Sequence, residues 1–471
     1  MKKEKTALVL FSVLALLAFA PMVQEHLDFP KVRPLAGVTE PVKMPKLNLK
    51  SYAEGHFQRG AEKYVKYHYG YRPITIRLYN QYLWDFYHKT YTKNTVVEGK
   101  DGWLYEPWFV EDYYHGGTYS QKKDSLKLSQ SLHQEAFRIY QLQNLLASFG
   151  TTLIVCQAPG KDLVYSEHLP PDTVSSRPKQ LSAREFYDKE FESLGVNHIN
   201  MEHWFLQMKD TVDFLLFPQK GTHWSNIAAV YAADSIFRYI EGKNGILMPQ
   251  RVIGEPHIDR IRKPDYDLEE LFNLNRPLEK LPQHYAEVTV LPRKDAVKPK
   301  MIVIGDSFFW NISLQIPLDS LFSSVSYWYY NNTIYFDKKH KSVKEVNLVE
   351  ALLDADVVML MYCSTQLYKM SDGFSKQALR ALCYDEKELE EIKMEIVKKI
   401  REDSSWMKSV RRRAEKHQIP IDTVLIHEAQ NSIERYPELF LPALRDSIPD
   451  KLSTIAKQRF HALEISRGIY P

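Results

Sequence analysis

A long apolar run follows a basic N-terminus. Three lysines within the first five residues precede residues 6–23, an apolar segment of eighteen residues that only Ser12 and Pro21 interrupt. A basic segment followed by an apolar one is typical of an export signal. As a helix the run is about 27 Å long, close to a bilayer core of about 30 Å. Pro21 follows the small-x-small site Ala18-Phe19-Ala20 and disfavours cleavage there. We therefore expect residues 1–26 to be a signal anchor rather than a removed signal peptide.

Residues 27–94 are expected to form a linker followed by helices. Up to residue 49 the segment is rich in Pro, Lys and Val without periodicity, which is typical of an extended tether. Between residue 52 and about residue 90, large apolar side chains recur at three- and four-residue spacing, the pattern of helices that pack on a larger body. They are Phe57, Tyr64, Tyr67, Ile76, Leu78, Tyr79, Tyr82, Leu83 and Phe86. We expect them to be core residues.

Residues 95–375 show the pattern of an α/β domain. A hairpin is predicted at 96–105, with Lys-Asp-Gly as its turn, and an amphipathic helix at 125–149, which Gly150 ends. Near-continuous apolar runs predict buried strands, and amphipathic helices are predicted between them. The strands are 151–157, 300–304 and 355–361, and the helices 225–239 and 343–353. This alternation predicts a parallel sheet flanked by helices.

The segment after the predicted sheet is rich in charged residues. Beyond residue 385, acidic and then basic residues alternate with few long apolar runs, which is typical of solvated helix faces. Residues 376–471 are therefore predicted to be a helical C-terminal region, to which no function is assigned. No later segment repeats the length and apolarity of the N-terminal run, so the chain after it is expected to form one body outside the membrane.

Composition excludes several classes of protein. With 44% hydrophobic and 26% charged residues the chain can bury a core, and a net charge of +3 makes nucleic acid an unexpected partner. Three cysteines, Cys156, Cys363 and Cys383, cannot form a disulfide framework, although one bridge is not excluded. No Cys/His cluster, HExxH, P-loop or GxGxxG motif occurs. We therefore expect no metal, nucleotide or dinucleotide cofactor.

Two polar residues are candidates for catalysis. Ser307 follows a predicted buried strand and Gly305, the arrangement that presents a nucleophile at the open end of a parallel sheet. A serine in that position can instead cap the next helix. A serine nucleophile needs a neutral histidine as its base. His223 opens the predicted 225–239 helix and is the best-placed candidate, although it can also pack beside Trp224 or cap that helix.

The blocks around these residues resemble a known family. Gly305-Asp306-Ser307-Phe308 resembles the nucleophile motif of SGNH (GDSL-type) hydrolases, and Gly221-Thr222-His223-Trp224 resembles the histidine motif of AlgX/AlgJ polysaccharide O-acetyltransferases. In both this chain and that group the histidine precedes the serine, the reverse of ordinary SGNH enzymes. Residues 97–104 are similar to the group's GxDGWLF hairpin, and residues 158–170 to its PxK…YPExLP element. The resemblance runs from about residue 29 to residue 374.

One position departs from the family pattern. The family's aspartate two residues before the histidine falls at Gly221, so the group that orients the imidazole is missing from its usual place. Three interpretations remain open: a carboxylate from elsewhere, with Glu202 and Asp213 nearest in sequence; a Ser-His dyad oriented by a backbone carbonyl; or an inactive site.

The resemblance implies a specific function. It implies an acyltransferase of SGNH type that moves acetyl onto an exported polysaccharide, with Ser307 as nucleophile and His223 as base. It also implies a membrane-bound O-acyltransferase partner as acetyl donor, and a periplasmic location with the N-terminal segment anchored in the inner membrane. Two alternatives remain: an SGNH-type carbohydrate esterase or deacetylase, and a catalytically inactive polysaccharide-binding scaffold of an export assembly.

Overall fold

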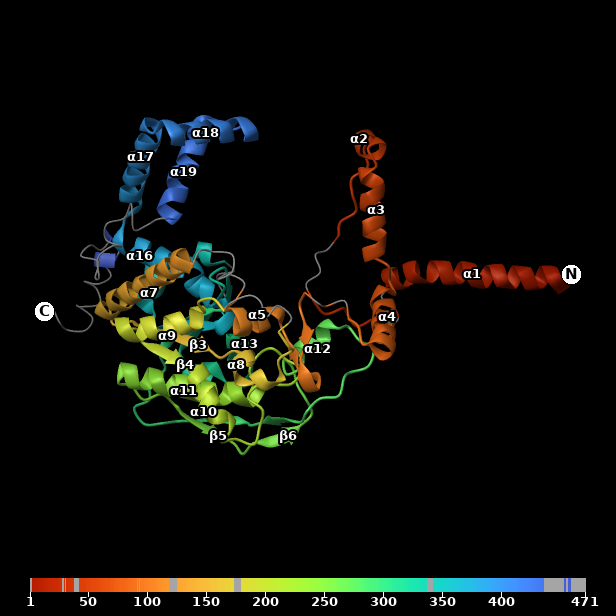
Figure 1. The fold of residues 1–471 in the computed structure, drawn as a ribbon, viewed down its shortest axis with the longest axis horizontal. Coiled ribbons are helices and arrows are strands. Elements are labelled where there is room, and N and C mark those ends of the chain that lie inside the picture. The colour runs from red at the N-terminus through yellow and green to blue at the C-terminus, as the bar shows by residue number, and fades with distance from the viewer. Residues whose placement is uncertain are drawn as a thin grey trace. The chain divides into compact units, whose positions relative to one another are not determined.

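The computed structural model contains two compact units (Figure 1). The first comprises Met1–Pro107, Gln219–Thr222 and Ile261–Leu281, and the second comprises Trp108–Pro218, His223–Arg260 and Pro282–Pro471. The structure describes residues 2–27, 29, 31–37, 42–90, 92, 94–117, 125–172, 179–336, 342–435, 453–454 and 456–458.

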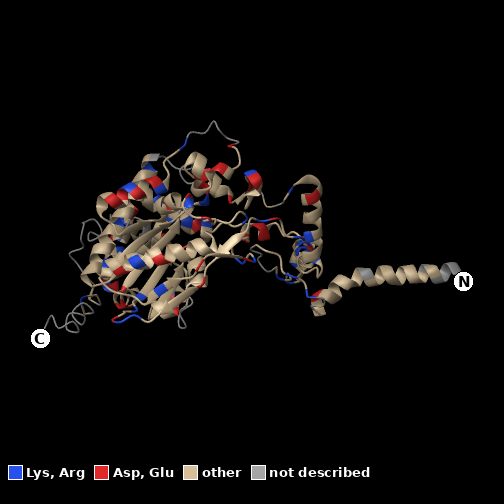
Figure 2. Cartoon of the chain, turned by 90° about the horizontal axis from the view of Figure 1, so that it is seen from below, with Lys and Arg blue, Asp and Glu red and all other residues tan. Residues whose placement is uncertain are grey.

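The first unit begins with a long apolar helix, α1 (Lys2–Leu27). Its segment Leu8–Leu27 has the length and mean hydropathy of a membrane span, and it alone has them among the described helices. Figure 2 shows no charged residue along the middle of α1. Both a membrane anchor and an export signal have this character.

Four shorter α-helices and a hairpin are described in the rest of the first unit. They are α2 (Leu49–Ala53), α3 (His56–Tyr67), α4 (Arg72–Tyr87), β1 (Val97–Glu98) and β2 (Leu104–Tyr105), with α12 (Asp267–Leu271) packed beside the hairpin. The predicted hairpin is confirmed, because Val97 pairs with Tyr105 in an antiparallel ladder. A small core lies between these elements: Val96, Leu104, Leu268, Phe272 and Leu274.

The expected burial of the apolar side chains on α4 is wrong for four of the six, while Ile76 and Leu83 are half-buried. Leu78, Tyr79, Tyr82 and Phe86 are 54%, 51%, 47% and 73% exposed. Their spacing is helical as predicted, but periodicity identifies only the face of a helix that is apolar. It does not identify which face meets the protein.

A six-stranded sheet organises the second unit. Its order is β11-β10-β9-β12-β3-β4, with every pair parallel except β10 and β11. The strands are β3 (Thr152–Ala158), β4 (His198–Asn200), β9 (Lys300–Gly305), β10 (Ser324–Tyr329), β11 (Thr333–Tyr335) and β12 (Val357–Cys363). The three predicted strands are confirmed as the adjacent strands β9, β12 and β3. The α/β fold with a parallel sheet and flanking helices is therefore confirmed.

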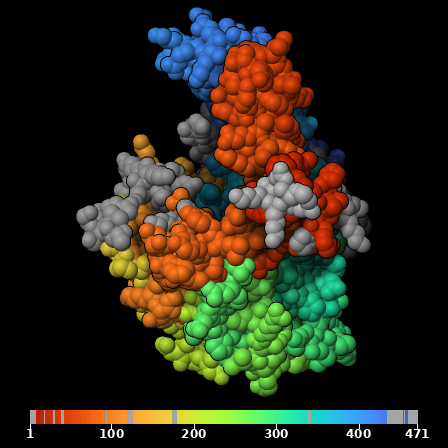
Figure 3. Space-filling model, turned by 90° about the vertical axis from the view of Figure 1, so that its right-hand side faces the viewer, coloured from red at the N-terminus to blue at the C-terminus, as the bar shows by residue number. Residues whose placement is uncertain are grey.

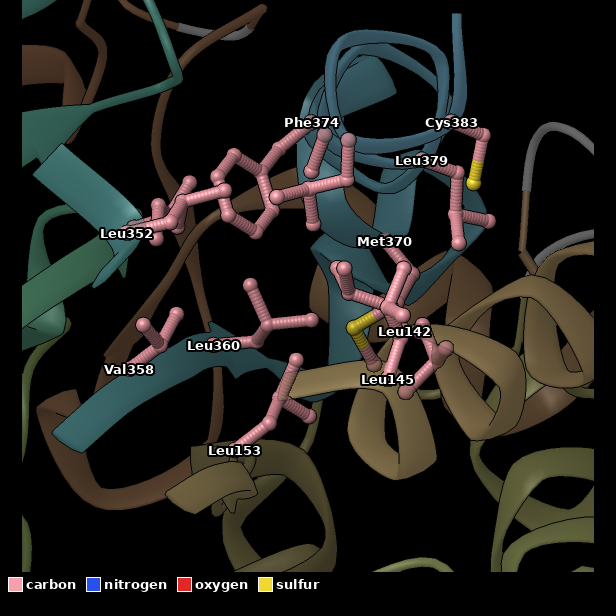
Figure 4. Close-up of a cluster of buried hydrophobic side chains, with 14 of the residues drawn as sticks. Leu142, Leu145, Leu153, Leu352, Val358, Leu360, Met370, Phe374, Leu379 and Cys383 are labelled. Atoms are coloured by element: carbon pink, nitrogen blue, oxygen red, sulfur yellow. The ribbon is translucent and has the colours of Figure 1, made fainter. Parts of the chain in front are cut away.

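Helices cover the sheet on two sides. One face packs on α7 (Ser125–Ser148), α9 (Ala183–Leu194), α15 (Leu348–Asp354) and α16 (Phe374–Cys383). Figure 4 shows part of this core, where Leu153, Val358 and Leu360 of the strands face helix residues such as Leu142 and Leu379. The helices α10 (Met201–Lys209), α11 (Asn226–Asn244) and α13 (Phe308–Gln315) contact the central strands β3 and β12. Strands covered on both faces need apolar side chains throughout, which explains the continuous runs in the sequence.

The predicted helical C-terminal region is present where it is described. It contains α17 (Glu386–Glu402), α18 (Ser404–His417) and α19 (Ile421–Arg435), which pack through buried residues such as Ile400, Val410 and Leu425. Most of the predicted region beyond Arg435 lies outside the described residues. The three cysteines are all buried and free, so the bridge that the sequence left open does not form.

Candidate active site

Ser307 lies in a tight turn between a strand and a helix. β9 ends at Gly305 and α13 begins at Phe308. A Cβ atom at Gly305 would lie 2.1 Å from the carbonyl oxygen of Met361 on β12, so only glycine fits between the strands. The chain can therefore turn at once after a central strand, and the turn places Ser307 at the carboxyl edge of the sheet. Ligands bind at this edge in open α/β sheets.

Asp306 holds this turn from inside. Its carboxylate accepts hydrogen bonds from the N–H of Phe308 at 3.0 Å and from the N–H of Cys363 at 2.7 Å. Burial raises the pKa of Asp306, and these backbone donors and the nearby His223 oppose that shift. Asp306 thus joins the ends of β9 and β12 and turns away from Ser307, as the sequence suggested for a structural cap.

His223 is held by its neighbours in sequence. Trp224 is fully buried and packs against Phe205 and Phe308. The amide of Asn311 on α13 donates to the carbonyl oxygen of Trp224 at 2.9 Å. Ser225 accepts a hydrogen bond from the N–H of Ala228 and caps α11. The histidine loop is therefore attached directly to the helix that begins after Ser307.

The structure brings His223 and Ser307 together. Nε2 of His223 lies 2.7 Å from Oγ of Ser307, across 84 positions of sequence, and both side chains are partly exposed. Ser307 occupies the N-cap position of α13, but its side chain makes no capping hydrogen bond. The imidazole packs against Phe308 without capping α11, because Ser225 does that. This geometry is the one that a serine nucleophile and its base require.

The two carboxylates nearest in sequence to His223 are placed differently. Oε2 of Glu202 accepts hydrogen bonds from Arg184 at 3.2 Å and from the N–H of Gly160 at 3.3 Å. Asp213 is exposed to solvent. Glu202 therefore serves a buried ion cluster that the sequence did not predict.

This buried cluster places three carboxylates around one guanidinium. Nη2 of Arg184 lies 2.8 Å from Asp162 and 2.9 Å from Asp112, and Nη1 lies 3.2 Å from Glu202. Burial raises the pKa of Asp112 to about 7 and also raises that of Glu202, although Arg184 opposes both shifts. Burial disfavours the charge on Arg184, but the carboxylates outweigh it and raise the arginine pKa. Within the described part of the chain, no group of three His, Cys, Asp or Glu side chains is arranged to hold a metal ion.

The cluster supports the loop that follows β3. A Cβ atom at Gly160 would lie 2.3 Å from Oδ1 of Asp162 and 2.5 Å from Oγ of Ser364, which directly follows β12. The loop therefore packs tightly against the end of the neighbouring strand. The nearby Lys161 is buried and donates to the carbonyl oxygen of Pro218 at 2.7 Å. No local motif could have revealed the cluster, because its members come from four separate segments.

A second feature that the sequence did not predict is a group of aromatic rings beside Ser307. Trp310 lies in the first turn of α13, and its backbone N–H donates to the carbonyl oxygen of Ser307 at 3.1 Å. Its ring centroid lies 4.7 Å from that of Tyr335 and 5.6 Å from that of Phe336. Tyr335 and Phe336 are 38% and 52% exposed. We call Trp310, Tyr327, Tyr329, Tyr335 and Phe336 the aromatic cluster.

The backbone around the aromatic cluster is strained. Tyr330, Asn331 and Phe336 have φ angles of 48°, 49° and 67°, in a region that large side chains rarely adopt. The N–H of Tyr330 donates to the carbonyl oxygen of Gly305 at 2.9 Å, which joins this segment to the serine turn. Such strain persists only where the surrounding structure enforces it, and it is common at functional sites. The aromatic run Tyr327-Trp328-Tyr329-Tyr330 was the available signal in the sequence.

Comparisons with known proteins agree with this architecture. Residues 96–315 match the sequence model of a family described as "SGNH hydrolase-like domain, acetyltransferase AlgX". No curated protein matches the chain in a sequence search.

Several solved structures are similar to parts of the chain at low sequence identity. The O-acetyltransferase domain of Pseudomonas putida AlgJ is 16% identical, over 61% of this chain and 98% of its own, with a TM-score of 0.38. Pseudomonas aeruginosa AlgX is 12% identical, over 60% of this chain and 67% of its own, with a TM-score of 0.38. Bacillus cereus PatB1 is 14% identical, over 58% of this chain and 96% of its own, with a TM-score of 0.34. Residues 96–315, which include both His223 and Ser307, are thus similar to the family of AlgX SGNH hydrolase-like domains.

Proposed function

We propose that this protein is an O-acetyltransferase that acts on an exported polysaccharide, with Ser307 as its nucleophile and His223 as its base. The observation that carries the proposal is the 2.7 Å distance between Nε2 of His223 and Oγ of Ser307 at the carboxyl edge of the sheet. The family model, whose description names an acetyltransferase, supports the reaction class. The proposed active site is thus a serine and a histidine within a family of acetyl-transferring domains.

The reaction proceeds in two balanced steps. As Oγ of Ser307 attacks the acetyl carbonyl carbon of the donor, Nε2 of His223 takes the hydroxyl proton and then delivers it to the leaving group. Nε2 next takes a proton from a sugar hydroxyl, whose oxygen attacks the acetyl-serine carbonyl. Oγ leaves and recovers the proton. Ser307 is the N-cap residue of α13, so backbone N–H groups and the positive end of the helix dipole stabilise the oxyanion of both tetrahedral intermediates.

The aromatic cluster supports a sugar as the acceptor. The flat, partly apolar face of a pyranose ring packs well on exposed aromatic side chains, and tyrosine hydroxyls can bond to sugar hydroxyls at the edge. Backbone hydrogen bonds join Trp310 of the cluster to Ser307, and Tyr330, which follows Tyr329 of the cluster, to Gly305. A sugar ring packed there would lie beside the nucleophile.

Tyr335→Ala is expected to raise the KM for the polysaccharide acceptor about 3- to 10-fold, because one stacking contact is lost. The value of kcat at saturating acceptor is expected to change far less, since the acetylated serine is untouched. Steady-state kinetics with varied acceptor concentration measures both quantities. Leu314→Ala is the matched control, since Leu314 is 64% exposed on α13 and lies outside the aromatic cluster. An unchanged KM for Tyr335→Ala would remove the cluster from the acceptor site.

Labelling with a fluorophosphonate probe tests the nucleophile directly. Peptide mass spectrometry is expected to find the phosphonyl group on Ser307, and no adduct should form on Ser307→Ala. An unlabelled native protein, or a label that Ser307→Ala does not remove, contradicts the proposal and favours a polysaccharide-binding scaffold. Acetate release from a model ester without transfer to added polysaccharide would instead indicate an esterase or deacetylase.

The donor and the location complete the proposal. The acetyl group would come from a membrane-bound O-acyltransferase partner, and the catalytic unit would lie in the periplasm. The support for this part is the apolar helix α1, whose residues Leu8–Leu27 are long enough to cross the inner membrane as an anchor.

A further inference from the structure

The side of helix α4 that faces the protein carries two polar side chains, Arg77 and Asn80, as well as Trp84, which packs on Phe272. Arg77 is 6% exposed, and its guanidinium donates to the carbonyl oxygens of Arg33 at 2.7 Å and Pro34 at 2.6 Å. The amide of Asn80 donates to the carbonyl oxygen of Phe272 at 2.8 Å. These side chains hold the linker and the α12 region to the helix by hydrogen bonds.

The opposite side of α4 is an exposed apolar surface. Ile74, Leu78, Tyr82 and Phe86, spaced four residues apart, are 37%, 54%, 47% and 73% exposed, and Tyr79 beside them is 51% exposed. We call these five residues the α4 stripe. Asp85, the charged residue at its edge, is paired with Arg276 at 2.5 Å. A continuous exposed apolar surface of this kind marks a contact with something other than water.

The beginning of α4 lies against the end of α1. The turn before α4 contains Gly70, where a Cβ atom would lie 2.3 Å from the carbonyl oxygen of Pro21 and 2.7 Å from the backbone N of Glu25. The imidazole of His68 lies 3.0 Å from the carboxylate of Glu25. Gln24, 4% exposed, is buried at the same place. The last turns of α1 are therefore packed on the turn from which α4 departs.

Within this unit, α4 extends crosswise to α1 (Figure 1). The atoms of α1 and of the helices after it, red to orange, face the viewer in Figure 3. If α1 follows the bilayer normal, α4 extends along the membrane surface from the point where α1 emerges. Sixteen residues of helix then give about 24 Å of contact along that surface.

We infer that the α4 stripe lies in the interface of the lipid bilayer, where α4 acts as a surface helix beside the anchor α1. Leucine, isoleucine and phenylalanine side chains enter the acyl boundary, and the tyrosines place apolar rings at the headgroup level with their hydroxyls toward water. A lipid surface is the occupant, rather than a second copy of the chain, because the stripe begins at the membrane end of α1. This inference rests on the proposed membrane anchor α1 and is independent of the proposed reaction.

Site-directed fluorescence tests the inference in the full-length protein. The variants Leu78→Cys, Tyr82→Cys and Phe86→Cys can be labelled selectively with an environment-sensitive nitrobenzoxadiazole dye, because the three native cysteines are buried. The protein is reconstituted in phosphatidylethanolamine and phosphatidylglycerol vesicles, with and without a nitroxide-labelled phospholipid. Ile258→Cys is the control, since Ile258 is an equally exposed apolar residue of the other unit, at 63%.

The expected result is a blue-shifted emission at all three stripe positions and quenching by the nitroxide lipid about threefold greater than at the control. Emission typical of water, with the iodide quenching of Ile258→Cys, overturns the inference. Protection from iodide without nitroxide quenching also overturns it and indicates a protein on the stripe. Disulfide-linked dimers of Phe86→Cys would then identify a second copy.

Discussion

Replacing His223 with alanine is expected to lower the kcat of acetyl transfer about 10⁴-fold, because no base then removes the proton from Ser307. Ser307→Ala is expected to be at least as severe, since the acetyl-enzyme cannot form. The two residues act as one unit through their 2.7 Å contact. The double variant is therefore expected to be no slower than the more impaired single variant. Transfer of radiolabelled acetyl to polysaccharide measures all three.

His203→Ala is the control for this series, because His203 is a histidine with a 61% exposed side chain on the surface helix α10. Its rate is expected to stay within about twofold of the native protein, as for most surface substitutions. If His223→Ala retained the native rate, His223 would be excluded as the base. If the fold-loss of kcat in the double variant equalled the product of the two single losses, the two side chains would act in separate steps.

Replacing Arg184 is expected to lower the free energy of unfolding of the protein by several kcal/mol. Arg184→Met leaves Asp112, Asp162 and Glu202 buried without the guanidinium that holds them together. Breaking a buried ion cluster by removing one partner costs about 3–5 kcal/mol of the free energy of unfolding, because unpaired buried charge is left behind. Urea unfolding followed by circular dichroism and tryptophan fluorescence measures the change.

Arg238→Met supplies the comparison for this measurement. Arg238 is also paired with a carboxylate, that of Asp234 at 2.7 Å, but its side chain is 70% exposed. Exposed ion pairs contribute about 0–1 kcal/mol, so this variant is expected to unfold almost as the native protein does. Equal midpoints for Arg184→Met and Arg238→Met would show that the buried cluster does not stabilise the sheet domain.

Sequence patterns predicted the centre of the molecule better than its periphery. The runs that became β3, β9 and β12 were recognisable because strands covered on both faces must be apolar at nearly every position. β10 and the edge strand β11 were missed, since both are partly exposed and have no such run. The aromatic cluster was therefore also missed, because it forms only when these strands lie beside α13.

The candidate site divides in the same way. The motifs around Ser307 and His223 identified both residues, because a glycine turn after a buried strand and a histidine before a capped helix are local arrangements. Glu202, considered from the sequence as a substitute for the missing aspartate at Gly221, instead pairs with Arg184. Its position along the chain is close to His223, but proximity in sequence does not determine which charge a buried carboxylate faces.

The amino-acid sequence by itself determined the apolar N-terminal helix, the α/β alternation, the resemblance to AlgX/AlgJ domains and the identities of the two candidate catalytic residues, because these depend on local periodicity and short motifs. Only the tertiary structure decided that His223 meets Ser307, that Arg184 gathers three carboxylates, and that the α4 stripe stays exposed. Each of these depends on which distant surfaces pack together. Burial follows from that packing, and the spacing of residues along a chain does not specify it.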